Sequence, residues 1–267
     1  MITIALLCLL LGGLAVGTAP ATFAQPLPPQ LPVPSQLLPA DQALDKVCTT
    51  LKEQQAFSVE VDTVYDNVLA DEQKIQYSAY QMLSVQKPDR VRSDYVGDER
   101  VSRFYYNGKS FALLSPLQNL YVSREAPATI DAAVDAIAEK YDVTIPLSNL
   151  IVSDPCTKLK LDTLEATYIG TDMVNRVPGY HYLFTGKTRD WQLWVSEGEK
   201  PLPLKMVITY RDLPQSPQYT AVFSRWDLSP QFGEQTFAFV PPEGARAIGF
   251  LSSEPTQKPD QKPGGKK

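Results

Sequence analysis

The chain has 267 residues, of which 43% belong to the hydrophobic set, and 25 Lys and Arg stand against 30 Asp and Glu. A net charge of −5 argues against a basic nucleic-acid-binding protein, and 13 Tyr, 10 Phe and 3 Trp argue against a wholly disordered chain. One His and three Cys do not favour a Cys/His zinc site, and any histidine-dependent triad would have to use His181.

Residues 1–24 contain no charged side chain and predict a signal peptide. An apolar stretch, Met1–Val16, precedes small residues, and the TFA tripeptide at 22–24 offers a cleavage site. Cys8 lies within the apolar stretch and would leave with the signal. We therefore expect export, with a retained N-terminal anchor as the alternative.

Two further segments flank a central domain. Residues 25–39 hold six prolines in fifteen positions, which predicts an extended linker. Residues 252–267 carry four Lys against two acids and none of the hydrophobic set, which predicts a disordered basic tail. The domain between them, residues 40–251, has 21 basic and 28 acidic residues and is large enough to bury a core.

The domain begins with a helix. Leu44, Val47, Cys48 and Leu51 recur at helical spacing, and Asp41 is the candidate cap. From Ala56 the period changes to two, which predicts a half-buried strand that presents Phe57, Val59, Val61, Thr63 and Tyr65 on one face. Further strands are predicted at Ile75–Val85, Arg90–Tyr95, Val101–Tyr106, Ser110–Leu114 and Leu120–Ser123. The dipeptide Asn107-Gly108 predicts a tight hairpin turn.

A second helix is predicted over Ala128–Asp142. Its apolar stripe contains Ile130, Ala133, Val134, Ile137, Ala138 and Tyr141. Packing on a sheet is the simplest interpretation, and covering a ligand cavity or meeting a membrane are the alternatives. A short helical turn is predicted at Leu147–Val152.

Strands then return without intervening helices. They are predicted at Ala166–Ile169, Tyr180–Thr185, Trp191–Ser196, Leu204–Tyr210, Tyr219–Trp226, Phe237–Val240 and Arg246–Phe250. Such succession favours antiparallel pairing. About 10 to 11 strands with two or three helices predict an α+β fold, a strongly curved sheet or half-open barrel with helices on its concave side.

Four blocks of sequence carry a family resemblance. They are FYYNGKSFALLSPLQNLYVS (104–123), ATIDAAVDAIAEKYDVTIPLSNLIVSDP (128–155), DWQLWVSEGEKPLPLKMVITY (190–210) and FAFVPPEGARAI (237–248). Over residues 42–250 the chain resembles the DUF2092 family of predicted periplasmic proteins, which is similar in turn to the LolA/LolB-like fold. The resemblance implies a half-closed antiparallel barrel whose helices cover an apolar cavity, and periplasmic binding of acyl chains or lipidated protein. Fold similarity alone does not fix a function.

Two cysteines remain after signal cleavage. In an oxidising compartment an even pair predicts a disulfide, here between Cys48 and Cys156, with two separate buried thiols as the main alternative.

Successive side chains of a strand point to opposite faces of the sheet, so the parity of a residue number predicts its face for two tryptophans and the histidine. Trp191 shares its parity with Leu193 and Val195 and is assigned to the apolar face, and Trp194 to the other. His181 points away from its neighbours Tyr180 and Tyr182, and a structural role is expected for it.

Function is expected to lie in binding rather than catalysis. No G-x-S-x-G elbow or Gly-rich phosphate loop occurs, and we expect no catalytic residue, metal or cofactor. The candidate ligand-binding residues are Phe57, Val59, Tyr77, Phe111, Ile130, Val134, Ile137, Trp191 and Phe223, with the second helix as a lid.

We expect a monomer that binds an apolar ligand and no nucleic acid, with membrane contact left open. The alternatives are an envelope module that binds a protein partner through its surface, and an enzyme on the same scaffold.

Overall fold

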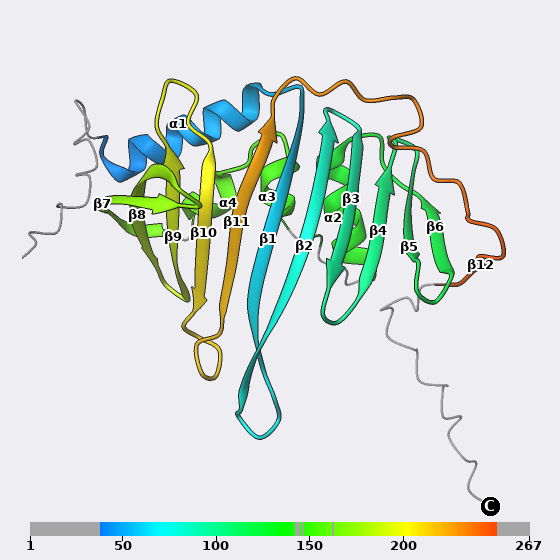
Figure 1. The fold of residues 1–267 in the computed structure, drawn as a ribbon, viewed down its shortest axis with the longest axis horizontal. Coiled ribbons are helices and arrows are strands. Elements are labelled where there is room, and N and C mark those ends of the chain that lie inside the picture. The colour runs from blue at the N-terminus through cyan, green and yellow to red at the C-terminus, as the bar shows by residue number, and fades with distance from the viewer. Residues whose placement is uncertain (1–37, 142–144, 146, 162, 250–267) are drawn as a thin grey trace, which may run out of the picture. The chain divides into compact units, whose positions relative to one another are not determined.

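A single sheet of twelve strands dominates the part of the chain described by the computed structural model, residues 38–141, 145, 147–161 and 163–249 (Figure 1). The strand order is β12-β6-β5-β4-β3-β2-β1-β11-β10-β9-β8-β7. The first half comprises β1 (Ala56–Val68), β2 (Lys74–Gln86), β3 (Arg90–Gly97), β4 (Val101–Tyr106), β5 (Ser110–Ser115) and β6 (Leu120–Glu125). The second half comprises β7 (Thr163–Val174), β8 (Val177–Gly186), β9 (Arg189–Ser196), β10 (Pro203–Tyr210), β11 (Gln218–Asp227) and β12 (Arg246–Ala247).

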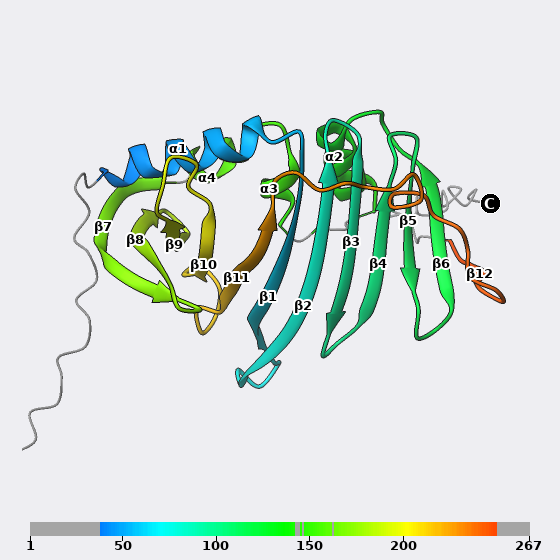
Figure 2. The same ribbon diagram turned by 45° about the horizontal axis from the view of Figure 1, so that its top comes forward.

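Four helices accompany the sheet in the described residues. They are α1 (Ala40–Glu53), α2 (Ile130–Tyr141), α3 (Ser148–Ile151) and α4 (Thr157–Leu161). The sheet stays open and curves strongly, and β7 to β10 curl round beneath α1 (Figure 2). The predicted curved antiparallel sheet with helices on its concave side is therefore confirmed. None of the helices among these residues is long and apolar enough to cross a membrane.

The connections explain how two halves of the chain form one sheet. Consecutive strands β1 to β6 form a meander, and β7 to β11 form a second one. Antiparallel pairing of β1 with β11 joins the two, with Val61 opposite Phe223 and Tyr65 opposite Tyr219. The segment from α2 to α4 carries the chain from β6, the second strand from one edge of the sheet, to β7 at the other edge.

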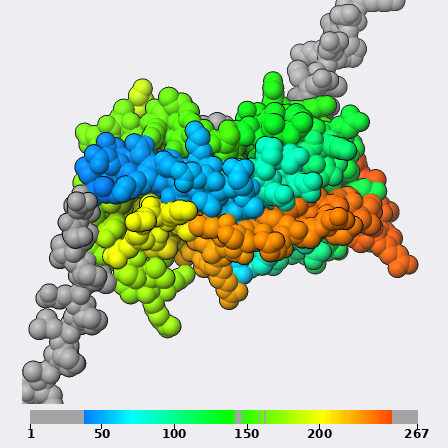
Figure 3. Space-filling model, turned by 90° about the horizontal axis from the view of Figure 1, so that it is seen from above, coloured from blue at the N-terminus to red at the C-terminus, as the bar shows by residue number. Residues whose placement is uncertain are grey.

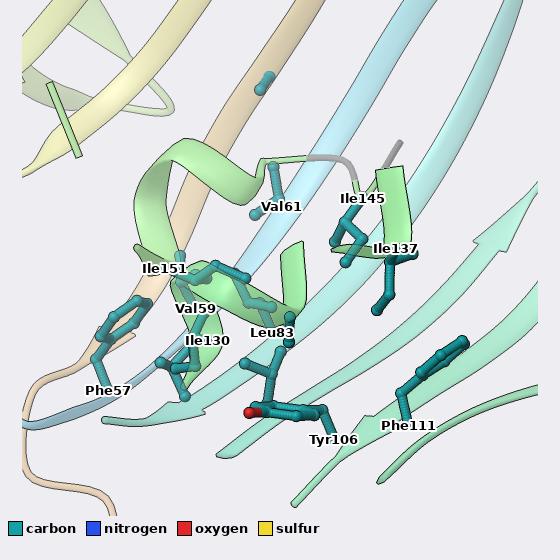
Figure 4. Packing of buried hydrophobic residues seen from close by; sticks show 14 of the residues in the cluster. Phe57, Val59, Val61, Leu83, Tyr106, Phe111, Ile130, Ile137, Ile145 and Ile151 are labelled. Carbon is teal, nitrogen blue, oxygen red and sulfur yellow. The ribbon is translucent and has the colours of Figure 1, made fainter. Parts of the chain in front are cut away.

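Alternating side chains give the sheet an inner and an outer face. On the inner side, one cluster of buried residues packs with α2 and includes Phe57, Leu83 and Ile137 (Figure 4). A second cluster packs with α1 and includes Leu44, Tyr182 and Trp191. Each cluster joins strand residues of one parity to the apolar stripe of a helix, the arrangement that hydrophobic burial favours.

A segment without regular structure follows β11 and covers part of the outer face. It passes over the ends of the strands toward β6, beside α1 when seen from above (Figures 1 and 3). Phe239 contacts the rings of Tyr105 and Tyr121 at centroid distances of 5.5 and 5.2 Å, and Phe237 is buried. The segment ends in β12, which pairs in parallel with β6.

Several predictions from the sequence need correction. Phe237–Val240 is not a strand, because its aromatic rings pack on the outer face while its backbone stays outside the ladder. The strand expected at Arg246–Phe250 shortens to Arg246–Ala247 within the described residues. The strand number is twelve rather than 10 to 11. Asp41 lies inside the first turn of α1, since Pro39 occupies the cap position.

Residues 1–37 and 250–267 lie outside the described residues. The predicted signal peptide, most of the linker and the basic tail fall there, and they stay predictions.

Candidate functional site

A cavity of about 340 Å³ lies between the inner face of β9 to β11, α1 and the chain from Ile145 to Leu159. The residues lining it are Leu44, Val47, Leu51, Ile145, Leu147, Ser148, Asn149, Leu150, Pro155, Cys156, Leu159, Arg189, Trp191, Leu193, Pro203, Met206, Ile208, Tyr210, Tyr219 and Phe223. Apart from Ser148, Asn149 and Arg189, these are aliphatic, aromatic, proline, methionine or half-cystine side chains. The volume falls within the range of ligand-binding pockets, about 300–1,000 Å³.

The sheet wall of the cavity is set by strand register. Trp191 stands opposite Ile208, and Leu193 opposite Met206. Because cross-strand partners share a face, these four side chains form one continuous apolar surface. Trp191 also stacks on Phe184, with ring centroids 3.9 Å apart and planes at 7°, which fixes the orientation of the indole.

The roof of the cavity consists of α1 and the segment after α2. Leu44, Val47 and Leu51 of α1 are 3% exposed or less and face the sheet. The predicted disulfide between Cys48 and Cys156 is present, with Cα atoms 5.8 Å apart. Since Cys156 lines the cavity, the bond joins the two parts of the roof.

Five of the residues that line the cavity carry polar side-chain groups. Arg189, Tyr210, Tyr219, Ser148 and Asn149 all line the cavity and are all partly exposed. Burial raises the pKa of the Tyr219 phenol above its usual value of 10.0, so this side chain stays neutral at physiological pH. These residues therefore add hydrogen-bonding groups to an otherwise apolar lining.

The structure distributes the predicted ligand-binding residues over three places. Trp191 and Phe223 line the cavity. Phe57, Val59, Phe111, Ile130 and Ile137 belong to the buried cluster under α2, and Val134 packs against it (Figure 4). Tyr77 contacts Tyr65 across the β1–β2 hairpin, with ring centroids 5.7 Å apart. No described residue of α2 lines the cavity, so the roof is formed by α1 and the later segment instead.

The sequence did not indicate that α1 and the segment after α2 would cover the cavity, or that β10 would form part of its sheet side. The helical stripe of Leu44, Val47 and Leu51 was visible, but nothing in the sequence shows which strands it covers. Met206 and Ile208 share the parity of Tyr210 in β10, and the same alternation that selected Trp191 could have selected them.

Trp194 and His181 lie on the opposite face, as predicted. Trp194 belongs to a small outer cluster with Val174, Leu204 and Val207. His181 stacks on Trp194 with ring centroids 3.9 Å apart, and its Nε2 lies 2.9 Å from Gln192 Oε1. Burial lowers the pKa of His181, so the imidazole is neutral at pH 7 and acts as a packed aromatic ring.

Ligands for a metal do not gather in the part of the chain that the structure describes. No three His, Cys, Asp or Glu side chains lie close enough there to hold an ion.

The protein is therefore an open, curved and mainly antiparallel sheet, and helices cover an apolar cavity on its inner face. The chain belongs to the family described as predicted periplasmic protein (DUF2092), whose family model matches residues 40–251. The family resemblance and the periplasmic location expected from the sequence are thereby confirmed.

Solved structures with a similar arrangement have low sequence identity. An uncharacterized conserved protein from Thermus thermophilus is 10% identical, with a TM-score of 0.44 over 78% of this chain and 98% of its own. A LolA superfamily protein from Nitrosomonas europaea is 13% identical, with a TM-score of 0.36 over 76% of this chain and 99% of its own. LprF from Mycobacterium bovis is 14% identical, with a TM-score of 0.40 over 77% of this chain and 97% of its own. None of the curated proteins matches the chain. Because these TM-scores lie below 0.5, function is inferred from the cavity itself.

Proposed function

We propose that this protein is a non-catalytic periplasmic carrier or sensor, which binds an apolar ligand such as the acyl chain of a lipid or lipidated protein. The observation that supports the proposal is the cavity of about 340 Å³ with its predominantly apolar lining. A chamber of this kind suits an apolar chain, since burying one methylene group is worth about 0.8 kcal/mol.

The position of Trp191 supplies a direct test. Its indole lines the cavity, whereas Trp194 lies three residues further along the same strand on the outer face. We expect dodecanol, a neutral single-chain probe, to change the tryptophan emission of delipidated protein. The change should persist in Trp194→Phe. It should be much smaller in Trp191→Phe, in which Trp226 remains in contact with the cavity residue Phe223. Circular dichroism should show that both variants fold.

Native mass spectrometry provides an independent test. Protein purified without detergent should carry a lipid-sized adduct that organic extraction removes. The proposal is wrong if no adduct is found and the emission of delipidated wild-type protein does not respond to dodecanol.

A second candidate function is binding of a protein partner along β7. This strand is an edge of the sheet, and Leu164, Ile169 and Met173 on it are 61%, 52% and 46% exposed. An edge strand with exposed apolar side chains favours addition of a partner strand. A photo-crosslinking residue at position 169 should then give one defined adduct in the periplasm. The same group at Val96, exposed but on the interior strand β3, should give none.

A further inference from the structure

We infer that Tyr219 recognises the polar end of the ligand, and that its hydroxyl donates a hydrogen bond to the neutral carbonyl oxygen of an acyl ester or acyl amide. The cavity therefore takes an acyl chain that is linked to another group, in preference to a free fatty acid. This inference rests on the proposed function, because it names the ligand class of the same cavity.

The first observation is the position of Tyr219 in the sheet wall of the cavity. It lies on β11 opposite Ile208 of β10, and both side chains line the cavity. Four residues further along β11, Phe223 lines it as well. Because side chains two and four residues apart in a strand share a face, Tyr219 presents its phenol on the same side as these apolar neighbours.

The second observation concerns the hydrogen bonding of the Tyr219 hydroxyl. Among the described residues this hydroxyl takes part in no hydrogen bond. On the neighbouring strand, Tyr65 stands opposite Tyr219 and donates its own hydroxyl to Glu99. A phenol in largely apolar surroundings usually has a hydrogen-bond partner, because leaving it without one costs free energy. Since Tyr219 lines the cavity, a bound ligand can supply that partner.

The third observation is that the surroundings of this phenol disfavour negative charge. Burial raises the pKa of Tyr219 above 10.0, and the neighbouring phenols of Tyr95 and Tyr210 raise it further. The same surroundings disfavour a carboxylate placed against the hydroxyl, since a desolvated anion is costly. A carbonyl oxygen accepts the same hydrogen bond without a charge. An ester or amide therefore suits this position better than a free fatty acid.

The cavity volume sets the chain length of the probes. A methylene group fills about the 30 Å³ that a water molecule occupies in the liquid. A chamber of about 340 Å³ therefore accommodates about eleven such groups. One acyl chain of about ten carbons with a methyl ester fits this volume.

The test compares polar groups on one chain length. Methyl decanoate, decyl methyl ether and decanoate are titrated into delipidated full-length protein at neutral pH, and tryptophan emission reports binding. The ether oxygen is a weaker acceptor than a carbonyl, and decanoate carries a charge. We expect methyl decanoate to bind about fivefold more tightly than the ether, the effect of one hydrogen bond, and decanoate to bind most weakly. N-Methyldecanamide, measured beside the ester, separates an amide-linked from an ester-linked acyl chain as the preferred source of the carbonyl.

Variants assign the hydrogen bond to one hydroxyl. Tyr219→Phe should lower the affinity for methyl decanoate about fivefold and leave the affinity for the ether unchanged. A change in folding or in the shape of the cavity would instead affect both probes. Tyr77→Phe removes the same atom two strands away, on the far side of Tyr65, and should behave as wild type because Tyr77 does not line the cavity. Circular dichroism should show that both variants fold.

The outcomes separate the two proposals. If decanoate binds as tightly as methyl decanoate, the preference for a neutral carbonyl is wrong. If Tyr219→Phe keeps the wild-type affinity for the ester, or loses affinity for ester and ether alike, the role of the Tyr219 hydroxyl is wrong. In each of these cases binding of the ether leaves the proposed function standing. If no probe binds to wild type, the proposed function itself fails.

Discussion

Removal of the Cys48–Cys156 disulfide should destabilise the protein strongly. The two cysteines are 108 residues apart in sequence, so the bond closes a long loop in the unfolded chain. For a loop of this length the chain-entropy relation gives about 4.7 kcal/mol. A domain of 150–250 residues loses about 2–4 °C per kcal/mol, which predicts a fall in Tm of about 9–19 °C. The double variant Cys48→Ala/Cys156→Ala keeps the cavity apolar and is the preferred form of the change.

The assay is urea unfolding followed by tryptophan emission, with and without a phosphine reductant. Reduced wild type and the double variant should unfold at nearly the same urea concentration, well below that of oxidised wild type. The reductant should not affect the double variant. The m-value should also be smaller for oxidised protein, because a cross-linked unfolded chain exposes less surface. Equal midpoints for oxidised and reduced wild type would refute the loop-entropy reasoning, and two titratable thiols in the native protein would refute the bond.

Two further predictions concern backbone packing and pH. A Cβ added at Gly179 would lie 2.8 Å from the carbonyl oxygen of Val195, whereas one added at Gly170 meets nothing within 4 Å. Gly179→Ala should therefore lower the free energy of unfolding, measured in urea, by about 1–3 kcal/mol. Gly170→Ala should leave it unchanged or raise it slightly. If Gly170→Ala were the more destabilising variant, the close packing of Gly179 on β9 would be contradicted. Burial raises the pKa of Tyr106, whose hydroxyl donates to the carbonyl of Pro127, from 10.0 to about 12. Because the folded-state pKa is the higher one, this stabilisation is complete below pH 10 and is lost as the pH rises from about 10 to about 12. Tyr106→Phe should lose less stability between pH 9 and pH 11 than wild type, and an identical loss in both proteins would count against the assignment.

Local periodicity predicted most of the strands and the faces of several side chains. The strand predicted at Val101–Tyr106 coincides with β4, and the turn at Asn107-Gly108 places Gly108 at a φ of 80°. Trp191 and Trp194 were assigned to opposite faces by parity, and the structure places them so. These features depend on residues that are neighbours in sequence, which is why alternation and turn chemistry suffice.

A bulge shows where parity fails. Alternation from Tyr219 through Phe223 would put Trp226 on the outer face. One extra residue in β11, with Arg225 at a φ of 49°, returns Trp226 to the inner side, where it contacts Phe57 and Phe223. The sequence pattern of β11 contains no sign of this insertion, because the bulge depends on its pairing with β1.

Local sequence was sufficient to define most of the elements of this protein and the apolar faces that must be buried. The disulfide was predicted from the even number of cysteines left after signal cleavage, and the structure contains it. Long-range pairing selected which of those faces enclose a cavity. Pairing of β1 with β11, and closure of α1 over β9 to β11, bring side chains of distant segments to one chamber, among them Val47 of α1 and Phe223 of β11. Periodicity indicates that a side chain is buried. It does not indicate which distant segment of the chain packs against that side chain. For that reason Phe57 and Trp191, which have the same alternating pattern, lie in a closed core and in a cavity wall respectively.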